Sequence, residues 1–157
     1  MTPAILVARK AGIAHAIHEY SHDPQAASFG EEAADKLGVD RQRVFKTLVV
    51  VAGSRSLAVA VVPVARQLDL KLMAKALGQK KVAMAAGADV ERSTGYVLGG
   101  VSPLGQKKPL PTVVDASAAD WETVFVSAGR RGLEIELSAN DLCRLTRGLL
   151  APIATRD

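Results

Sequence analysis

The chain has 157 residues, of which 48% are hydrophobic and 23% charged, as expected for a soluble globular protein with a hydrophobic core. Lys and Arg together number 20 and Asp and Glu 16, so the formal charge of +4 indicates only a mild preference for polyanionic partners. The single cysteine, Cys143, excludes an intramolecular disulfide. No apolar run is long enough to span a membrane, so we expect a cytoplasmic protein with no membrane partner.

The N-terminal part of the chain predicts two helices with a strand between them. The first helix has Thr2 as its N-cap and Gly12 as its stop. Residues 14–20 alternate between apolar and polar, which is typical of a half-buried strand. The second helix begins after Ser28, at capping-box spacing from a glutamate, and ends at Gly38.

The central part predicts a β-hairpin followed by smaller elements. Residues 46–52 and 57–63 are β-branched runs joined by the short segment GSRS, which favours an antiparallel hairpin. Their nearly continuous apolar character predicts a sheet covered on both faces. We then expect a short helix at 69–78, a short strand at 81–85 and a helical turn at 89–94.

The C-terminal part predicts three more strands and a last helix. The strands are expected at residues 111–115, 123–127 and 132–138, and Ser138 and Asp141 then open the helix. No linker or low-complexity tract divides the chain. We therefore expect one compact α/β (α+β) domain over residues 1–157, with a mixed, mostly antiparallel, barrel-like sheet flanked by helices.

The common catalytic and cofactor motifs are absent from the sequence. It contains no phosphate-binding loop, dinucleotide fingerprint or nucleophile elbow. His15, His18 and His22 do not have the spacing of convergent ligands, so we expect neither a metal nor a cofactor. Cys143 lies in an amphipathic helix, where a buried thiol is a simpler interpretation than a nucleophile.

Several polar residues remain open to two interpretations. Lys46 precedes an apolar strand, so it is either a solvated edge lysine or a cation held against an anionic ligand. Tyr20 ends a strand, where a buried hydroxyl usually finds a backbone partner. Glu134 alternates with the inward-facing Leu133 and Ile135, so a surface carboxylate is the simplest interpretation.

Three pairs of basic residues are interpreted as solvated faces in preference to phosphate sites. They are Lys80–Lys81, Lys107–Lys108 and Arg130–Arg131.

The stretch GYVLGGVSPLGQKKPLP at 95–111 is rich in glycine and proline and predicts a loop whose backbone could closely approach a ligand. Together with FKTLVV at 45–50 and SAGRRGLEIEL at 127–137, it resembles the YbaK family. This family consists of free-standing aminoacyl-tRNA deacylases related to the editing domain of bacterial prolyl-tRNA synthetases. The chain is most similar to the Cys-tRNA(Pro) deacylase branch, over essentially its whole length.

The resemblance implies a set of site residues. Lys46, in the motif with Thr47, matches a lysine required for activity and expected near the terminal adenosine or its phosphate. Tyr20 and Phe29 match positions that line the same pocket, and Glu134 stands where close relatives carry Asp. A loop of the form G-x-x-x-P is implied to shape the pocket and to face the aminoacyl carbonyl; its residues are Gly99, Gly100, Val101, Ser102 and Pro103.

The implied chemistry is hydrolysis of the ester between a mischarged amino acid and the tRNA 3′ end. Such an ester is already activated, so positioning and oxyanion stabilisation can supply most of the rate. The amides of Gly99 and Gly100 are expected to donate to the carbonyl oxygen, and Pro103 is expected to hold the loop in shape.

The resemblance to this branch implies that the thiol of the substrate attacks its own carbonyl and leaves as a cyclic thiolactone. Two alternatives remain open. One is a deacylase of Ala- or Ser/Thr-charged tRNA that uses a bound water, and the other is a non-catalytic module that binds tRNA or a synthetase. The expected partners are the acceptor end of aminoacyl-tRNA, with Cys-tRNA(Cys) as a second candidate substrate beside Cys-tRNA(Pro), and prolyl-tRNA synthetase in a transient complex, but not DNA.

Overall fold

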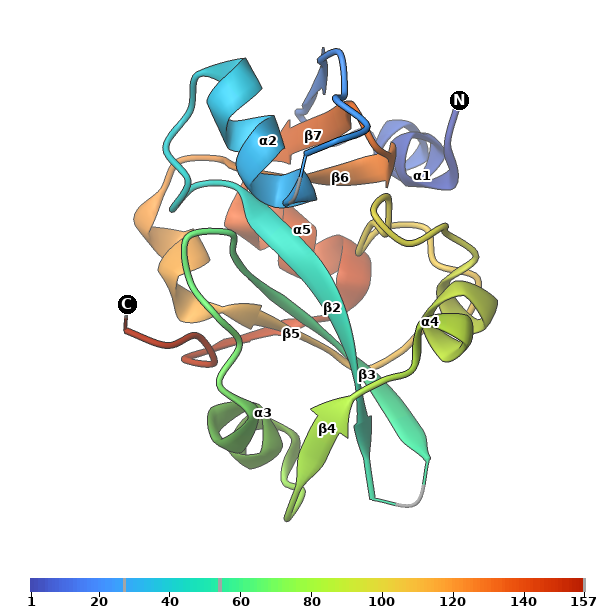
Figure 1. Cartoon of the computed structure of the whole chain (residues 1–157), viewed down its shortest axis with the longest axis vertical. Coiled ribbons are helices and arrows are strands. Elements are labelled where there is room, and N and C mark those ends of the chain that lie inside the picture. The colour runs from blue at the N-terminus through green and yellow to red at the C-terminus, as the bar shows by residue number, and fades with distance from the viewer. Residues whose placement is uncertain (27, 54, 157) are drawn as a thin grey trace.

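The computed structural model describes residues 1–26, 28–53 and 55–156. Helices and strands are interspersed along these ranges (Figure 1). In chain order they are α1 (Pro3–Ala11), β1 (Ala16–Glu19), α2 (Phe29–Leu37), β2 (Phe45–Ala52), β3 (Ser56–Pro63), α3 (Leu70–Leu77), β4 (Val82–Met84), α4 (Gly87–Thr94), β5 (Thr112–Asp115), the 3-10 helix η1 (Ala116–Asp120), β6 (Val124–Arg130), β7 (Leu133–Leu137), α5 (Ala139–Thr146) and β8 (Leu149–Ala151). In the described ranges, β2–β3 and β6–β7 are the two places where one strand directly follows another.

The strands form two sheets. The larger sheet has the order β4-β2-β3-β5-β8, in which β2 is antiparallel to β3 and β4 while β3, β5 and β8 are parallel. The smaller sheet has the order β1-β7-β6 and is antiparallel. A parallel bridge between Val44 and Phe125 connects the sheets. The expected mixed α/β architecture is confirmed, but the sheets meet at this bridge and do not close as a barrel.

Local capping signals position the helices where the sequence predicts them. The Thr2 side chain accepts a hydrogen bond from the amide of Ile5, and α1 ends at Gly12 with a φ of 67°. Ser28 caps α2 and Asp69 caps α3 in the same way. These predicted boundaries are therefore confirmed by backbone hydrogen bonding.

The larger sheet is buried on both faces, as its continuous apolar strands predict. One face contributes Val49, Val59 and Val61 to the main core, which also contains residues of α1, β6 and β7. The other face packs around Met73 of α3, together with Val50 and other small apolar residues. The central strands of this sheet are therefore covered on both faces, while its edge strands β4 and β8 keep exposed side chains.

The smaller sheet is also covered on both faces, by the main core on one and by α2 on the other, and this determines the environment of the site. Its inner face packs Leu133 and Ile135 into the main core. Its outer face carries Phe125, which packs against Ala33 and Ala34 of α2. Figure 1 shows α2 lying across β6 and β7. A polar side chain on that outer face is therefore beneath a helix.

Two regions differ from the expectation. Residues 89–94, expected as a helical turn, belong to the longer helix α4, which begins at Gly87. Residues 149–151 form the unexpected strand β8, which follows α5 almost directly and pairs in parallel with β5. None of the helices in the described ranges is long and apolar enough to cross a membrane.

Candidate active site

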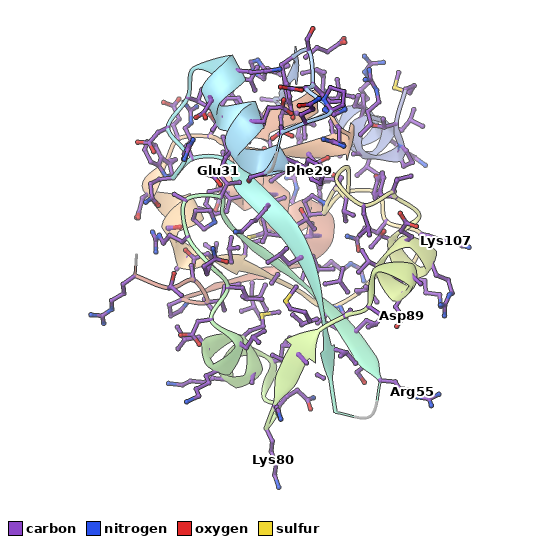
Figure 2. The ribbon with its side chains drawn as sticks, viewed as in Figure 1. Phe29, Glu31, Arg55, Lys80, Asp89 and Lys107 are labelled. Carbon is purple, nitrogen blue, oxygen red and sulfur yellow. The ribbon has the colours of Figure 1, made fainter. Side chains whose placement is uncertain are left out.

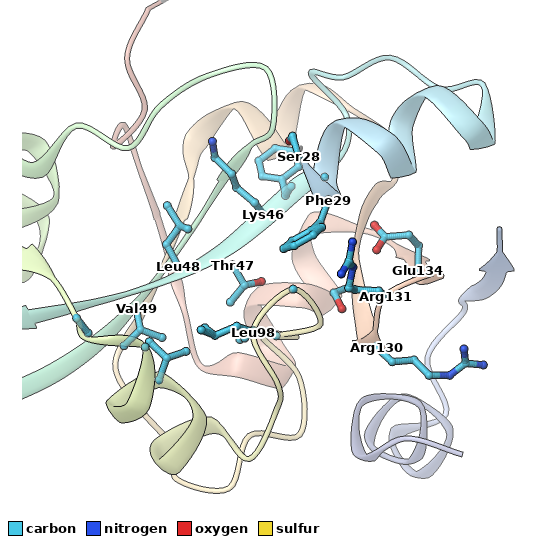
Figure 3. Close-up of a pocket in the computed structure, with 18 of the residues that line it drawn as sticks. Ser28, Phe29, Lys46, Thr47, Leu48, Val49, Leu98, Arg130, Arg131 and Glu134 are labelled. Atoms are coloured by element: carbon cyan, nitrogen blue, oxygen red, sulfur yellow. The ribbon is translucent and has the colours of Figure 1, made fainter. Parts of the chain in front are cut away.

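A pocket of about 460 Å³ lies between β2 of the larger sheet and β6 and β7 of the smaller sheet (Figure 3). The N-terminal end of α2, the start of α4 and the glycine-rich loop complete its walls. It brings together seven of the residues predicted for the site: Tyr20, Phe29, Lys46, Thr47, Gly99, Val101 and Glu134. The three motifs, which are far apart in the sequence, therefore meet at one cavity.

The amide of Gly100 is already hydrogen-bonded within its own loop. Its amide donates to the carbonyl of Val97 at 2.9 Å, so it is not available to a substrate oxygen in this structure. A Cβ at Gly100 would lie 2.7 Å from the Cα of Arg130. The residue is thus constrained by backbone packing against the β6–β7 turn, and its role as an oxyanion donor stays a prediction that would require this hydrogen bond to open.

Gly99 has a different environment. Its φ of 91° lies in the region that favours glycine, and a Cβ would stand 2.9 Å from Cε2 of Phe29 and 3.0 Å from Cδ of Arg131. Its amide has no hydrogen-bond partner within the part of the chain that the structure describes. Gly99 therefore makes room for the neighbouring aromatic side chain and keeps a free donor at the pocket wall.

Ser102 and Pro103 shape the loop from behind and do not line the pocket. The Ser102 hydroxyl is fully buried and accepts the amide of Leu104 at 3.2 Å, while its carbonyl accepts Nε2 of Gln106 at 3.0 Å. Both residues are buried and neither is among those that line the pocket, so direct contact of these two residues with substrate stays a prediction.

Lys46 and Thr47 enter the pocket from β2. Burial lowers the pKa of the half-buried Lys46, and the charge of Glu31 opposes that shift. Figure 3 shows the Lys46 side chain extending from β2 away from Phe29 and Thr47. The hydroxyl of Thr47 is buried and has no hydrogen-bond partner among the described residues. The pocket thus offers a cation at one edge and an unused hydroxyl inside.

Tyr20 and Glu134 form the wall beneath α2. The Tyr20 amide bonds the carbonyl of Gly132 at 3.0 Å, and burial, followed by the charge of Glu134, raises the pKa of its hydroxyl. Glu134 faces away from Leu133 and Ile135, as expected, but only 6% of it is exposed. Burial raises the pKa of Glu134 to about 8. The prediction of a surface carboxylate is wrong, because α2 covers this face of the sheet.

Arg131 was not expected in the site. Of the paired basic residues, Lys80 and Lys107 extend into solvent as predicted (Figure 2), and Arg130 points away from the pocket towards Glu19. Arg131 instead lies over the ring of Phe29, with Cζ 3.8 Å from the ring centroid.

The Nε and Nη2 atoms of Arg131 are buried and have no hydrogen-bond partner among the described residues. No sequence signal separates Arg131 from Arg130. Only the turn between β6 and β7 gives the two side chains opposite directions.

The remaining lining is largely apolar, and the possible nucleophiles are not activated. The apolar wall is formed by Leu48, Val49, Met84, Ala85, Val90 and Leu98. Ser127 reaches the pocket, but its hydroxyl accepts the amide of Gly129 at 3.1 Å. Cys143 is on α5 and is not among the lining residues, and burial raises the pKa of its thiol, which disfavours the thiolate. The site can therefore bind and orient an acyl ester more readily than attack it.

Comparison with known proteins gives a consistent result. The model of the aminoacyl-tRNA editing domain family matches residues 23–145. A candidate Cys-tRNA(Pro)/Cys-tRNA(Cys) deacylase of Enterococcus faecalis, EbsC, is 45% identical over 127 residues, which are 81% of this chain and 77% of that protein. The uncharacterized protein YwhH of Bacillus subtilis is 30% identical over 112 residues, or 71% of each chain.

Solved structures share the fold. The crystal structure of the hypothetical protein APE2540 superposes with a TM-score of 0.87 at 24% identity, covering 98% of this chain and 99% of that one. A candidate trans-editing enzyme for prolyl-tRNA synthetase superposes with a TM-score of 0.80 at 22% identity, covering 99% of both chains.

Proposed function

The chain belongs to the aminoacyl-tRNA editing domain family, and from that membership we propose that residues 1–157 form one editing domain that deacylates mischarged Cys-tRNA(Pro). The Enterococcus relative is identical to this chain at 45% of the aligned residues, and its name describes a Cys-tRNA(Pro)/Cys-tRNA(Cys) deacylase. This similarity supports the same activity and substrate for the present chain. A function in translation also supports a cytoplasmic location.

The observation that carries the proposal is the convergence of Lys46, Thr47 and Gly99 on one pocket. An aminoacylated 3′ end presents a phosphate, ribose hydroxyls and an ester carbonyl within a short distance of one another. Lys46 supplies a positive charge suited to the phosphate, and the free amide of Gly99 supplies a donor suited to the carbonyl oxygen. Thr47 supplies a hydroxyl without a partner for the ribose.

We propose that the cysteinyl substrate provides its own nucleophile. The thiol sulfur of the aminoacyl group bonds to the ester carbonyl carbon as the carbon–oxygen bond to the ribose breaks. The thiol proton passes to the departing ribose oxygen, which leaves as the tRNA 3′-terminal hydroxyl, and the amino acid leaves as a cyclic thiolactone. This route needs no protein nucleophile, which fits the unactivated Ser127 and the position of Cys143 outside the lining.

Deacylation of Cys-, Ala- and Ser-tRNA(Pro) tests the substrate and the route together. We expect loss of Cys-tRNA(Pro) in preference to the other two, with a thiolactone detected by mass spectrometry. Preferential loss of Ala-tRNA(Pro) would instead assign the chain to the branch that uses a bound water. No hydrolysis of any of the three would contradict the proposed enzyme and favour a binding module.

Lys46→Ala tests the role of the cation. Because a hydrogen bond to a charged group is worth about 1.5–3 kcal/mol, we expect kcat/KM to fall about 10- to 100-fold. Lys80→Ala, which removes a lysine that extends into solvent, is the matched control and should retain the wild-type rate. Unchanged turnover in Lys46→Ala would remove Lys46 from the site.

We also propose that selectivity for the body of the tRNA comes from a transient complex with prolyl-tRNA synthetase. Only 4% of the residues are aromatic, which leaves little surface for base stacking. The deacylation rate of Cys-tRNA(Pro) should therefore rise relative to Cys-tRNA(Cys) when the synthetase is added. An unchanged ratio would show that the domain selects its tRNA alone or not at all.

A further inference from the structure

Glu134 differs from the other buried carboxylates because it has no partner. The buried carboxylates of the described residues are Glu32, Asp115 and Glu134. Glu32 accepts the amide of Asp23 at 2.7 Å, and Asp115 accepts backbone amides near the C-terminus. Within the described ranges, Glu134 makes neither a hydrogen bond nor an ion pair. Its carboxyl group is therefore largely buried, reaches water only through the pocket and has no protein partner there.

The position of Glu134 suggests that a ligand supplies the missing partner. The residue lines the pocket, and Figure 3 shows its carboxyl group on β7 at the side next to Arg131. An unpaired buried carboxyl is neutral in an empty pocket and ionises when a cation is placed beside it, since burial is what disfavours its charge. A ligand with a positively charged group would thus gain a charge-assisted hydrogen bond here.

The cations of the protein do not fill this role. Lys46 and Arg131 both line the pocket, but no ion pair links either of them to Glu134 in the described structure. The Arg131 guanidinium is stacked on Phe29. The other ionisable group near Glu134 is the Tyr20 hydroxyl, which is not a cation. The carboxyl is therefore left available to a bound ligand.

We propose that Glu134 binds the α-ammonium group of the aminoacyl moiety and so selects substrates with a free amino group. The inference depends on the proposed function, because an aminoacyl ester carries one such cation next to the scissile carbonyl. Anchoring the ammonium on β7 would hold the ester carbonyl within the pocket relative to Gly99. Glu134 is thus a substrate-binding residue that determines specificity and takes no part in bond cleavage.

The test compares two substrates that differ only at the α-position. Cys-tRNA(Pro) is compared with its analogue in which a hydroxyl replaces the α-amino group, each rate divided by the spontaneous hydrolysis rate. We expect the wild type to prefer the amino substrate about 10- to 100-fold in kcat/KM, the range for a hydrogen bond to a charged group. Glu134→Gln should reduce that preference to less than about 3-fold, whereas Glu134→Asp should keep part of it.

A matched control removes a carboxylate from the same strand. Glu136 is two residues along β7 and is bound outside the pocket by His18, Arg43 and Thr123. Glu136→Gln should keep the wild-type preference for the amino substrate, whatever its effect on the absolute rate. A preference that is equally large in Glu134→Gln and the wild type would overturn the inference.

A binding measurement separates this inference from the proposed function. With a non-hydrolysable probe, adenosine with cysteine joined to its 3′ position by an amide, binding at pH 7 should release more protons from the wild type than from Glu134→Gln, because the protons taken up by the α-amino group of the probe are common to both. Calorimetry in buffers of different ionisation enthalpy measures this difference. Failure of the wild type to hydrolyse any aminoacyl-tRNA would refute the proposed activity, while equal proton release by the two proteins would refute the role of Glu134.

Discussion

Glu134 and Glu136 lie on the same face of β7, yet their pKa values are shifted in opposite directions. Burial raises the pKa of Glu134 to about 8. A hydrogen bond from Thr123 is the main cause that lowers the pKa of Glu136, and His18 and Arg43 add to the shift. Glu134 lines the pocket without a protein donor, whereas Glu136 accepts hydrogen bonds from several side chains, so the partners of each residue and not its strand position determine its charge.

This contrast predicts the pH dependence of stability. The folded-state pKa of Glu134 is above its ordinary value, so its contribution is present at low pH and is lost as the pH rises to about 8. Relative to Glu134→Gln, the wild type should lose several degrees of Tm between pH 5 and pH 8, at about 1.4 kcal/mol per pKa unit. Thermal unfolding of both proteins between pH 5 and pH 8 measures this difference in Tm. Plots of Tm against pH that run parallel for the two proteins would contradict the prediction.

Gly99 offers a prediction about the pocket itself. In Gly99→Ala the new methyl group would collide with Phe29 and Arg131, so we expect the stacked pair to move and kcat/KM to fall about 10-fold or more, since small misplacements in a site are costly. Gly38→Ala is the control, because Gly38 also has a positive φ of 70° but its Cβ would meet nothing within 4 Å. Both variants should lose about 1 kcal/mol of stability, and only the first should lose activity.

At the scale of elements, Asp115 fastens the C-terminal segment to the larger sheet. Its Oδ1 atom accepts the amides of Ile153 at 2.9 Å and Ala154 at 3.0 Å. Burial alone would raise the pKa of Asp115, but hydrogen bonds from Ser117 and these amides lower it. One side chain thus satisfies backbone groups that a sheet edge would leave unpaired.

We expect Asp115→Ala to reduce the free energy of unfolding by about 2–4 kcal/mol, because two buried amides lose their acceptor. The stabilisation by Asp115 is present above its ordinary pKa and is lost as the pH falls through the lower folded value. Urea denaturation at pH 7 and at pH 3 measures both effects. Asp120→Ala removes an exposed carboxylate of η1 and should cost little, and a similar loss in both variants would contradict the assignment.

The elements that depend on local signals could be predicted from the sequence, and those that depend on long-range pairing could not. The caps at Thr2 and Ser28 act within a few residues, and both were confirmed. Strand β8 has three residues and is specified by its pairing with β5, which no local pattern shows. The burial of Glu134 depends on α2, a helix about one hundred residues earlier in the chain.

At the scale of the whole molecule, the positive charge is spread over the surface. Arg55, Lys80 and Lys107 extend into solvent at different places (Figure 2), while Lys46 and Arg131 line the pocket. This distribution favours contacts with a few phosphates at the acceptor end over a long basic track. The overall charge of +4 assists the approach of tRNA without determining where it binds.

A salt titration measures the number of phosphate contacts. If two or three phosphates of the single-stranded 3′ end are neutralised, raising the salt from 50 to 200 mM should weaken tRNA binding about 10-fold. A loss of more than about 1,000-fold would indicate a much larger footprint, and no loss would exclude phosphate contacts. Fluorescence anisotropy of labelled deacylated tRNA gives the dissociation constants directly.

The site was predictable as a set of motifs but not as a three-dimensional arrangement. The motifs around Lys46, Gly99 and Glu134 do meet at one pocket. Gly100 carries the same motif signal as Gly99, yet its amide is already bonded to Val97. The two glycines differ only in which side of the loop faces the cavity, and that direction is determined by packing against the β6–β7 turn.

The location of the pocket between two sheets has a consequence for how this protein would lose its activity on heating. Its opposite walls belong to two sheet units that share the main hydrophobic core but are hydrogen-bonded to each other only near the bridge between Val44 and Phe125 in the described chain. A small slip of one unit against the other would pull Lys46 and Glu134 apart while leaving each sheet and its amide protection intact. On heating, the deacylation activity should therefore be lost at a lower temperature than the far-UV circular dichroism signal of the sheets. Activity would then report the relative position of the two sheets more sensitively than the secondary-structure signal does.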